Sequence, residues 1–185
     1  MMRKFLAFLV ALPLLVFTAV QAGAATEKSA FDYHVGDALI QSLGFPVGDK
    51  AMAENGDVVT IVATGTFDTV SGTATGGGTF SHHEVAAGRT ITGTFVTTGL
   101  ISFQSYGNAT PQGLPPSFFG GKLMLSIVAT PDVAPNLHLP ATLTVECVLG
   151  NPPAGAVEGI RVNVYDVINF NKTVPESGNN VFIQH

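Results

Sequence analysis

Hydrophobic and polar residues alternate along most of the chain from Asp57 onward. Val, Ile and Phe fill most of the apolar positions, Thr many of the polar ones, and clusters of Gly and Pro interrupt the runs. Because successive side chains of a β-strand point to opposite faces, a period of two predicts strands. We expect them at residues 57–67, 73–82, 89–103, 121–129, 141–149, 157–168 and 180–184.

Helical patterns are almost missing from the chain. Only residues 37–43 look weakly helical, and the whole segment 26–56 lacks a clean period. Regular strands without helices between them favour an all-β fold, a single antiparallel meander closed as a β-barrel, with a two-sheet β-sandwich as the alternative. We therefore expect an irregular N-terminal segment, residues 26–56, that packs on a barrel domain formed by residues 57–185.

Glycines recur within the expected strands. If the loop after the second strand is centred on residues 86–87, Phe80 lies opposite Gly93 and Phe95 lies opposite Gly78. Each aromatic ring could then cover a glycine across the ladder, which stabilises a sheet.

A second register follows from the turn expected at residues 153–154. It pairs Val145 with Val162 on the apolar face and Glu146 with Arg161 on the polar face. An exposed pair of opposite charge explains Glu146 and Arg161 without any catalytic role.

The N-terminus resembles a secretory signal peptide over residues 1–25. Two basic residues precede an apolar run at 5–20, and small residues follow at 22–25. The run contains Pro13 and is shorter than the roughly 20 residues that a membrane-spanning helix needs. Three Tyr and no Trp would also make poor interfacial girdles for an outer-membrane barrel. We expect a mature chain without a membrane span, secreted or periplasmic.

Composition excludes further classes of protein. With 46% hydrophobic and 11% charged residues the chain is not disordered, and a single cysteine excludes an intrachain disulfide framework. Cys147 shares a face with Leu143 and Val145, which predicts a buried, unreactive thiol. A net charge of −5 makes nucleic acid an improbable partner.

The sequence Ser-His-His-Glu at residues 81–84 is the nearest approach to a reactive cluster. On a strand His82 and Glu84 share a face with Phe80, and imidazole beside carboxylate can move protons or bind a metal. Both are weak catalytic candidates, because a polar hairpin end explains them as well. Two ligands do not make a metal site, and the other histidines have no ligand spacing, so we expect no metal and no cofactor.

Other carboxylates fall at strand ends. Asp57 is explained there by capping and solvation. Glu158 and Asp166 bracket one apolar face and could mark two rims of a barrel, where burial would raise the pKa of a carboxyl group.

Two long connections are expected, at residues 106–121 and 130–140. Long loops often bind ligands, so Tyr106, Phe118 and Phe119 are the weak ligand-binding candidates, although the two Phe rings could equally plug one barrel end.

Three functions remain open at this point. The first is binding of a small or hydrophobic ligand at one barrel end, the second a small-molecule cyclase or isomerase, and the third a non-catalytic structural or surface role. Asn108 and Asn171 begin glycosylation sequons, which matter if the source is eukaryotic.

Overall fold

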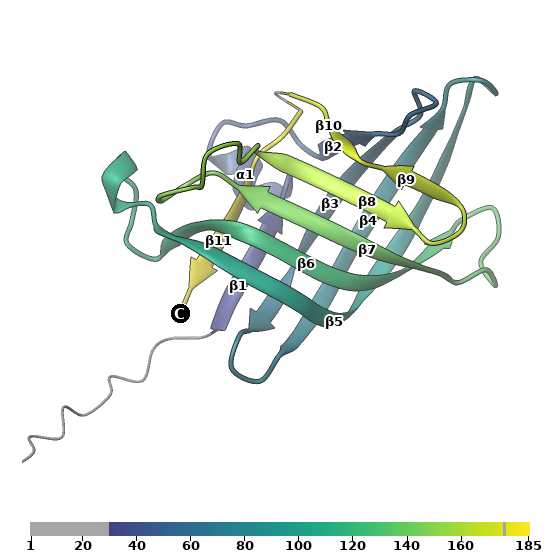
Figure 1. Ribbon diagram of the computed structural model, residues 1–185. Coiled ribbons are helices and arrows are strands. Elements are labelled where there is room, and N and C mark those ends of the chain that lie inside the picture. The colour runs from purple at the N-terminus through teal and green to yellow at the C-terminus, as the bar shows by residue number, and fades with distance from the viewer. Residues whose placement is uncertain (1–29, 176) are drawn as a thin grey trace, which may run out of the picture.

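The structure is a computed structural model that describes residues 30–175 and 177–185 (Figure 1). In this part of the chain the fold is all-β, an antiparallel sheet of 11 strands with one short α-helix and one 3₁₀ turn. The expected signal peptide, residues 1–25, lies outside the described residues.

Most of the described chain is strand, and the two helical segments are short. In chain order the elements are β1 (Ala30–Val35), α1 (Ala38–Ser42), β2 (Asp49–Met52), β3 (Val58–Asp68), β4 (Thr73–Glu84), β5 (Arg89–Asn108), η1 (Thr110–Gln112), β6 (Phe118–Pro131), β7 (Leu139–Cys147), β8 (Gly159–Val164), β9 (Ile168–Phe170), β10 (Lys172–Thr173) and β11 (Asn180–Gln184).

Six strands form a closed ring of hydrogen bonds, in the order β1-β3-β4-β5-β6-β11. Strands β3 to β9 run as a meander, each paired with the next, so the predicted all-β antiparallel organisation is confirmed. The ring is closed by β1 and β11 from the two ends of the described chain. At its other end β3 pairs with β2 and β6 pairs with β7, so the sheet continues past the ring (Figure 1).

The segment 26–56, which shows no clear period in sequence, contributes β1, α1 and β2. Asp37 caps the helix by accepting from the backbone N–H groups of Leu39 and Ile40, which explains why the faint helical pattern at 37–43 forms a real helix. In β1 the burial alternates strictly, with Phe31, Tyr33 and Val35 inside.

The predicted register of the β4–β5 ladder is confirmed, since Phe80 lies opposite Gly93 and Phe95 lies opposite Gly78. The Phe80 ring covers Gly93 as predicted, whereas the atoms nearest to Gly78 are backbone atoms of Val62 and Ala63.

The predicted register of the β7–β8 hairpin is wrong by two residues. Val145 pairs with Ile160, and Val162 pairs with Leu143. The connection is an irregular loop instead of a turn centred on 153–154, and Glu158 closes it by accepting from the N–H of Val148 at 2.7 Å. A shift by an even number keeps every side chain on its predicted face, so the apolar residues are still buried.

The long loop expected at 106–121 is also shorter in the structure. Strand β5 continues to Asn108 and β6 begins at Phe118. Three register irregularities, after Thr97, Leu100 and Ser105, interrupt the pairing of β5 with β6. Each bulge shifts the inward-facing positions by one residue, which hides the period of two in the second half of β5.

The strand expected at 157–168 is two strands. After Val164 the chain turns at residues 165–167, where Asp166 has a φ of 58°, and β9 folds back on β8.

Five phenylalanines fill the interior of the ring near β1 and β11. Their ring centroids lie 4.8–5.9 Å apart in stacked, tilted and edge-on pairs. This aromatic cluster consists of Phe31, Phe67, Phe103, Phe119 and Phe182. Such pairs each add about 0.5–1.5 kcal/mol beyond the burial of their area, so this end of the interior is solidly packed.

Gly93, which lies beneath the Phe80 ring, gives a direct test of how closely the β4–β5 ladder is packed. A Cβ on Gly93 would lie 2.5 Å from Phe80 Cζ and 2.4 Å from the Thr130 carbonyl oxygen. We expect Gly93→Ala to lower the free energy of unfolding by about 1–3 kcal/mol, measured by urea denaturation. Gly99→Ala is the control, since a Cβ there meets open space. Equal stabilities of the two variants would contradict the prediction.

Candidate functional site

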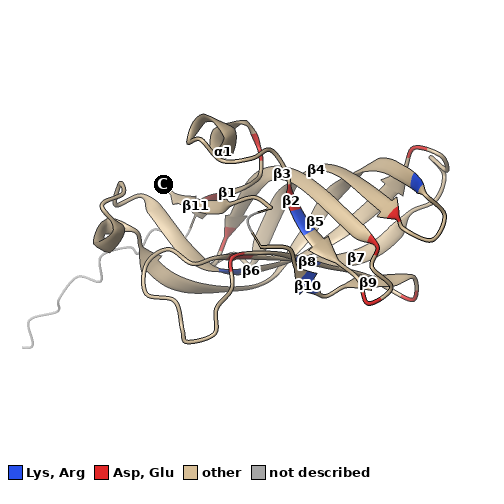
Figure 2. Ribbon diagram, turned by 90° about the horizontal axis from the view of Figure 1, so that it is seen from above, with Lys and Arg blue, Asp and Glu red and all other residues tan. Residues whose placement is uncertain are grey.

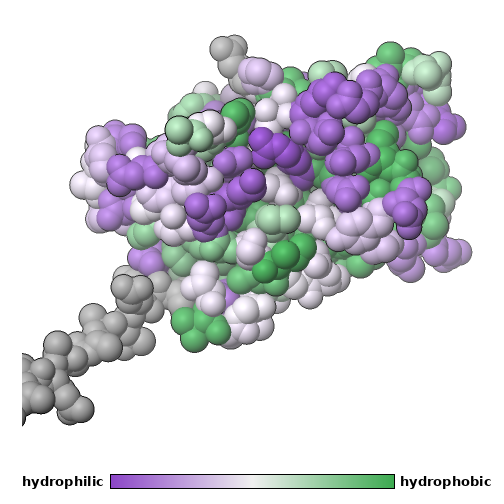
Figure 3. Space-filling model, in the orientation of Figure 1, coloured by the Kyte–Doolittle hydropathy of each residue, from purple (hydrophilic) through white to green (hydrophobic). Residues whose placement is uncertain are grey.

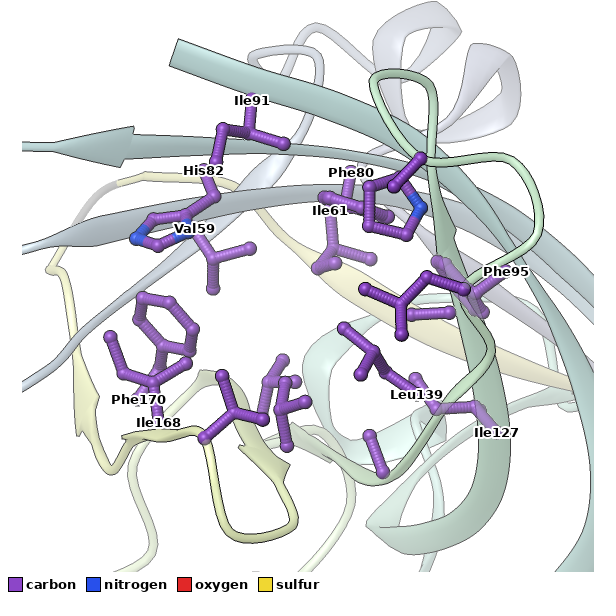
Figure 4. Close-up of a pocket in the computed structure, with 18 of the residues that line it drawn as sticks. Val59, Ile61, Phe80, His82, Ile91, Phe95, Ile127, Leu139, Ile168 and Phe170 are labelled. Carbon is purple, nitrogen blue, oxygen red and sulfur yellow. The ribbon is translucent and has the colours of Figure 1, made fainter. Parts of the chain in front are cut away.

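A pocket of about 260 Å³ opens between the β3–β6 part of the sheet and the β7–β9 part (Figure 4). It lies at the end of β6 opposite the aromatic cluster. The loop 132–138 and the β8–β9 turn form its rim. The residues that line it are Val59, Ile61, Phe80, His82, Glu84, Ile91, Phe95, Ile127, Ala129, Pro131, Val133, Ala134, Leu137, Leu139, Ala141, Val162, Val164, Val167, Ile168 and Phe170.

The pocket is apolar except at one side. Of its described lining residues only His82 and Glu84 are ionisable, and both come from β4. Apolar side chains continue to the rim, where Val133 is 77% exposed and Val167 62% exposed. Most charged residues of the described chain lie near strand ends (Figure 2). Figure 3 shows exposed apolar residues among polar ones at the end of the molecule that holds β9.

His82 is held in place by the carboxylate of Asp57, the residue immediately before β3. Its Nε2 lies 3.1 Å from Oδ2 of Asp57, and its ring meets Phe170 edge-on at 5.1 Å (Figure 4). The other oxygen of Asp57 accepts from the N–H of Val85 at 2.9 Å. This backbone hydrogen bond lowers the pKa of the Asp57 carboxyl group, so Asp57 is ionised and orients the imidazole.

Glu84 shares the pocket wall with His82, as their shared face predicts, but its charge is directed elsewhere. Its carboxylate accepts from Nε and Nη2 of Arg89 across the β4–β5 turn. The hydrogen bond from Arg89 lowers the pKa of Glu84. At this pocket, the histidine and the carboxylate that form a pair are therefore His82 and Asp57.

From the sequence, Asp57 was interpreted as a capping or solvated residue at a strand end. Its contact with His82 was therefore not predicted. The signal lay in the β3–β4 register, which pairs His82 with Val59. Asp57 is two residues before Val59 and so points to the same face, toward the imidazole.

Tyr106 and Phe119, two of the ligand-binding candidates, do not line this pocket. Tyr106 is only 6% exposed, and its hydroxyl donates to Oε1 of Glu146 at 2.8 Å. Burial raises the pKa of Tyr106 to about 12. Phe119 belongs to the aromatic cluster, as the plug interpretation expects. The third candidate, Phe118, lines a separate cleft.

The charged pair of the β7–β8 hairpin is not exposed, in contrast to the prediction. Arg161 donates to Oε2 of Glu146 at 3.0 Å, but Glu146 is 5% exposed. With the buried Tyr106 the pair forms a hydrogen-bonded network around the Glu146 carboxylate, and the Arg161 side chain is 31% exposed. The end of β5 brings the buried side chain of Tyr106 onto this face, which the sequence pattern marked as polar.

The remaining candidate positions divide between the surface and the core. Asn108 and Asn171 are exposed, and Cys147 is buried, as its alternation predicts; burial raises the pKa of its thiol. Residues 30–175 and 177–185 contain no group of three or more His, Cys, Asp or Glu side chains placed to hold a metal. Over the same residues no helix has the length and apolar character that crossing a membrane requires.

Comparison with protein-family models, curated proteins and solved structures found no match to this chain.

The pKa of Glu158 is unusually high for a carboxyl group. Burial, reinforced by the nearby charge of Asp49, raises its pKa from 4.5 to about 7, although the N–H groups of Val148 and Asn180 oppose the shift. A raised pKa of this kind is what the sequence predicts for a carboxylate buried at a rim.

This shift makes stability depend on pH. Between about pH 4.5 and 7 the folded chain keeps a proton on Glu158 that the unfolded chain releases, so stability falls as pH rises through this window and then levels off. We expect the stability difference between wild type and Glu158→Gln to change by about 3 kcal/mol across it, measured by urea denaturation at several pH values. Parallel pH profiles for the two proteins would contradict the assignment.

Proposed function

We propose that this chain is an exported β-barrel protein that binds a small hydrophobic molecule in the pocket beside His82. The observation that carries the proposal is the apolar pocket itself, open at one rim and walled by strands from both parts of the sheet. Binding sites for small molecules are typically concave and apolar with a few placed polar groups.

The size of the pocket suggests the class of ligand. An apolar cavity of about 150 Å³ is enough to bind benzene. A pocket of about 260 Å³ suits a single substituted ring or a short branched chain. His82, fixed by Asp57, offers one hydrogen-bonding position, so the ligand we propose carries one polar group on an apolar skeleton.

The apolar residues exposed at the rim indicate that a ligand enters the pocket on the side of the loop 132–138. Val133, Leu137 and Val167 expose large apolar surfaces there, and a ligand in the pocket would cover part of them. At the opposite end the aromatic cluster fills the interior of the ring, which favours the loop side as the entrance.

Export rests on the signal-like residues 1–25 and fits the state of the thiol. Cys147 is buried, so the chain can enter an oxidising compartment without forming disulfides between molecules.

Filling the pocket tests the binding proposal. We expect Ala134→Phe, at the half-buried rim, to weaken binding of probes such as toluene and cyclohexanol by at least about tenfold, because the new ring occupies their space. Val70→Phe is the control, since Val70 is 84% exposed in the β3–β4 turn. Binding would be followed by ligand-observed NMR and by thermal shift. No binding to wild type, or equal binding to both variants, would contradict the proposal and favour a structural role.

One observation also favours the second candidate, an isomerase or cyclase. His82 lines the pocket while an ionised carboxylate holds its Nε2, and such a pair can act as a general base. The geometry would suit removal of a proton next to a carbonyl group in an apolar ligand.

Proton exchange tests this second candidate without knowledge of the natural substrate. In D₂O we expect the wild type to speed deuterium uptake next to the carbonyl of 2-cyclohexenone, and His82→Ala to lose most of that acceleration, as seen by NMR. His83→Ala is the control, because His83 points to the other face and bonds Thr90. Equal rates in wild type and His82→Ala would remove the catalytic interpretation and leave the binding proposal intact.

A further inference from the structure

A second cleft lies at the other end of the molecule, beneath α1. Its volume is about 400 Å³. At its apolar wall Leu43 and Phe45 are 46% and 44% exposed. The cleft is lined by Ile40, Leu43, Phe45, Leu114, Phe118, Cys147, Val148, Leu149, Glu158, Asn179, Asn180 and Val181.

Polar groups that are largely withdrawn from water form one side of this cleft. Glu158 accepts from the N–H of Val148 at 2.7 Å and from the N–H of Asn180 at 3.0 Å. The side chain of Asn180, a residue only 3% exposed, donates its Nδ2 to Oδ2 of Asp49 at 2.8 Å. Its Oδ1 is buried and has no hydrogen-bond partner within the described residues.

Within residues 30–175 and 177–185, neither carboxylate of this group has a cationic partner. Asp49, which is fully buried, accepts from Ser177, Asn180 and the N–H of Lys50, all neutral donors. Glu158 accepts from backbone N–H groups, which are neutral as well. The described side chains that line the cleft include no Lys, Arg or His. Buried carboxylates are normally paired with cations, so the buried Asp49 and the half-buried Glu158 beside it lack the expected positive charge.

We propose that this second cleft binds an amphipathic amine, with the ammonium group on the Glu158 carboxylate and the apolar part against α1 and β6. Charge-assisted hydrogen bonds to a carboxylate in a desolvated setting are the strong ones. A bound ammonium group would also stabilise the ionised form of Glu158, which burial and Asp49 disfavour in the unliganded chain.

The apolar walls favour an organic cation over a metal ion. Calcium requires six to eight oxygen ligands, and magnesium retains several waters in an octahedral shell. Among the described lining residues Glu158 is the one carboxylate, and most of the other lining side chains are hydrocarbon. An alkylammonium ion satisfies both the carboxylate and the walls.

The test compares n-octylamine with n-octanol, which share an apolar chain and differ in charge. At about pH 8, where Glu158 is largely ionised, we expect wild type to bind the amine about tenfold more tightly than the alcohol by ligand-observed NMR. Glu158→Gln should bring the two affinities together. Glu54→Gln is the control, because Glu54 is exposed and pairs with Lys172 away from the cleft.

A second pair of variants keeps the test independent of Glu158 and of folding. Leu43→Lys places a cation at an exposed position of the cleft wall, and Leu43→Gln places a neutral side chain of similar length there. We expect the lysine variant to lose the preference for the amine and the glutamine variant to keep it. Ala134→Phe should leave amine binding unchanged, since it blocks the first pocket only.

Three outcomes would overturn the proposal. One is equal binding of amine and alcohol by wild type, and another is an unchanged preference in Leu43→Lys. The third is loss of amine binding in Ala134→Phe, which would place the amine in the first pocket.

Discussion

The pairing of β1 with β11 is the constraint on which the architecture depends. A strand at the edge of a sheet leaves a row of backbone N–H and C=O groups without partners. Here β1 bonds to β3 on one side and to β11 on the other, and β11 bonds in turn to β6, so both strands are paired on two sides. Segments from the two ends of the described chain thereby hold the meander closed.

Closure divides the interior into two unlike halves. Within the ring the aromatic cluster fills the space between facing strands. Beyond it, β2 and β7 replace β1 and β11 as the neighbours of β3 and β6, and the two parts of the sheet diverge. The inward side chains there are mainly aliphatic, and the β6–β7 wall includes the small residues Ala129 and Ala141. The first pocket lies in this part of the interior.

Carboxylates that are buried or half-buried lie at both ends of the molecule, and their hydrogen-bond partners differ. At the first pocket Asp57 faces an imidazole and a backbone donor. At the second cleft Glu158 and Asp49 share Asn180 and receive neutral donors. The contrast suggests different ligands for the two places, an apolar molecule with one polar group in the first and an apolar cation in the second.

A weak helical pattern and the capping residue Asp37 predicted the short helix α1. Local alternation determined most of the strands, the positions of Phe80 opposite Gly93 and of Phe95 opposite Gly78, and the burial of Cys147. These features depend on which face a side chain occupies, and a period of two carries that information. The extension of β5 was not predicted, because bulges break the period of two. The β7–β8 register was predicted wrongly, because a side chain, Glu158, closes the loop. Only the tertiary structure could join β1 to β11, bring Asp57 to His82, or bury the Glu146 side chain beside Tyr106. Each of these contacts joins segments whose relative placement depends on how the whole sheet closes.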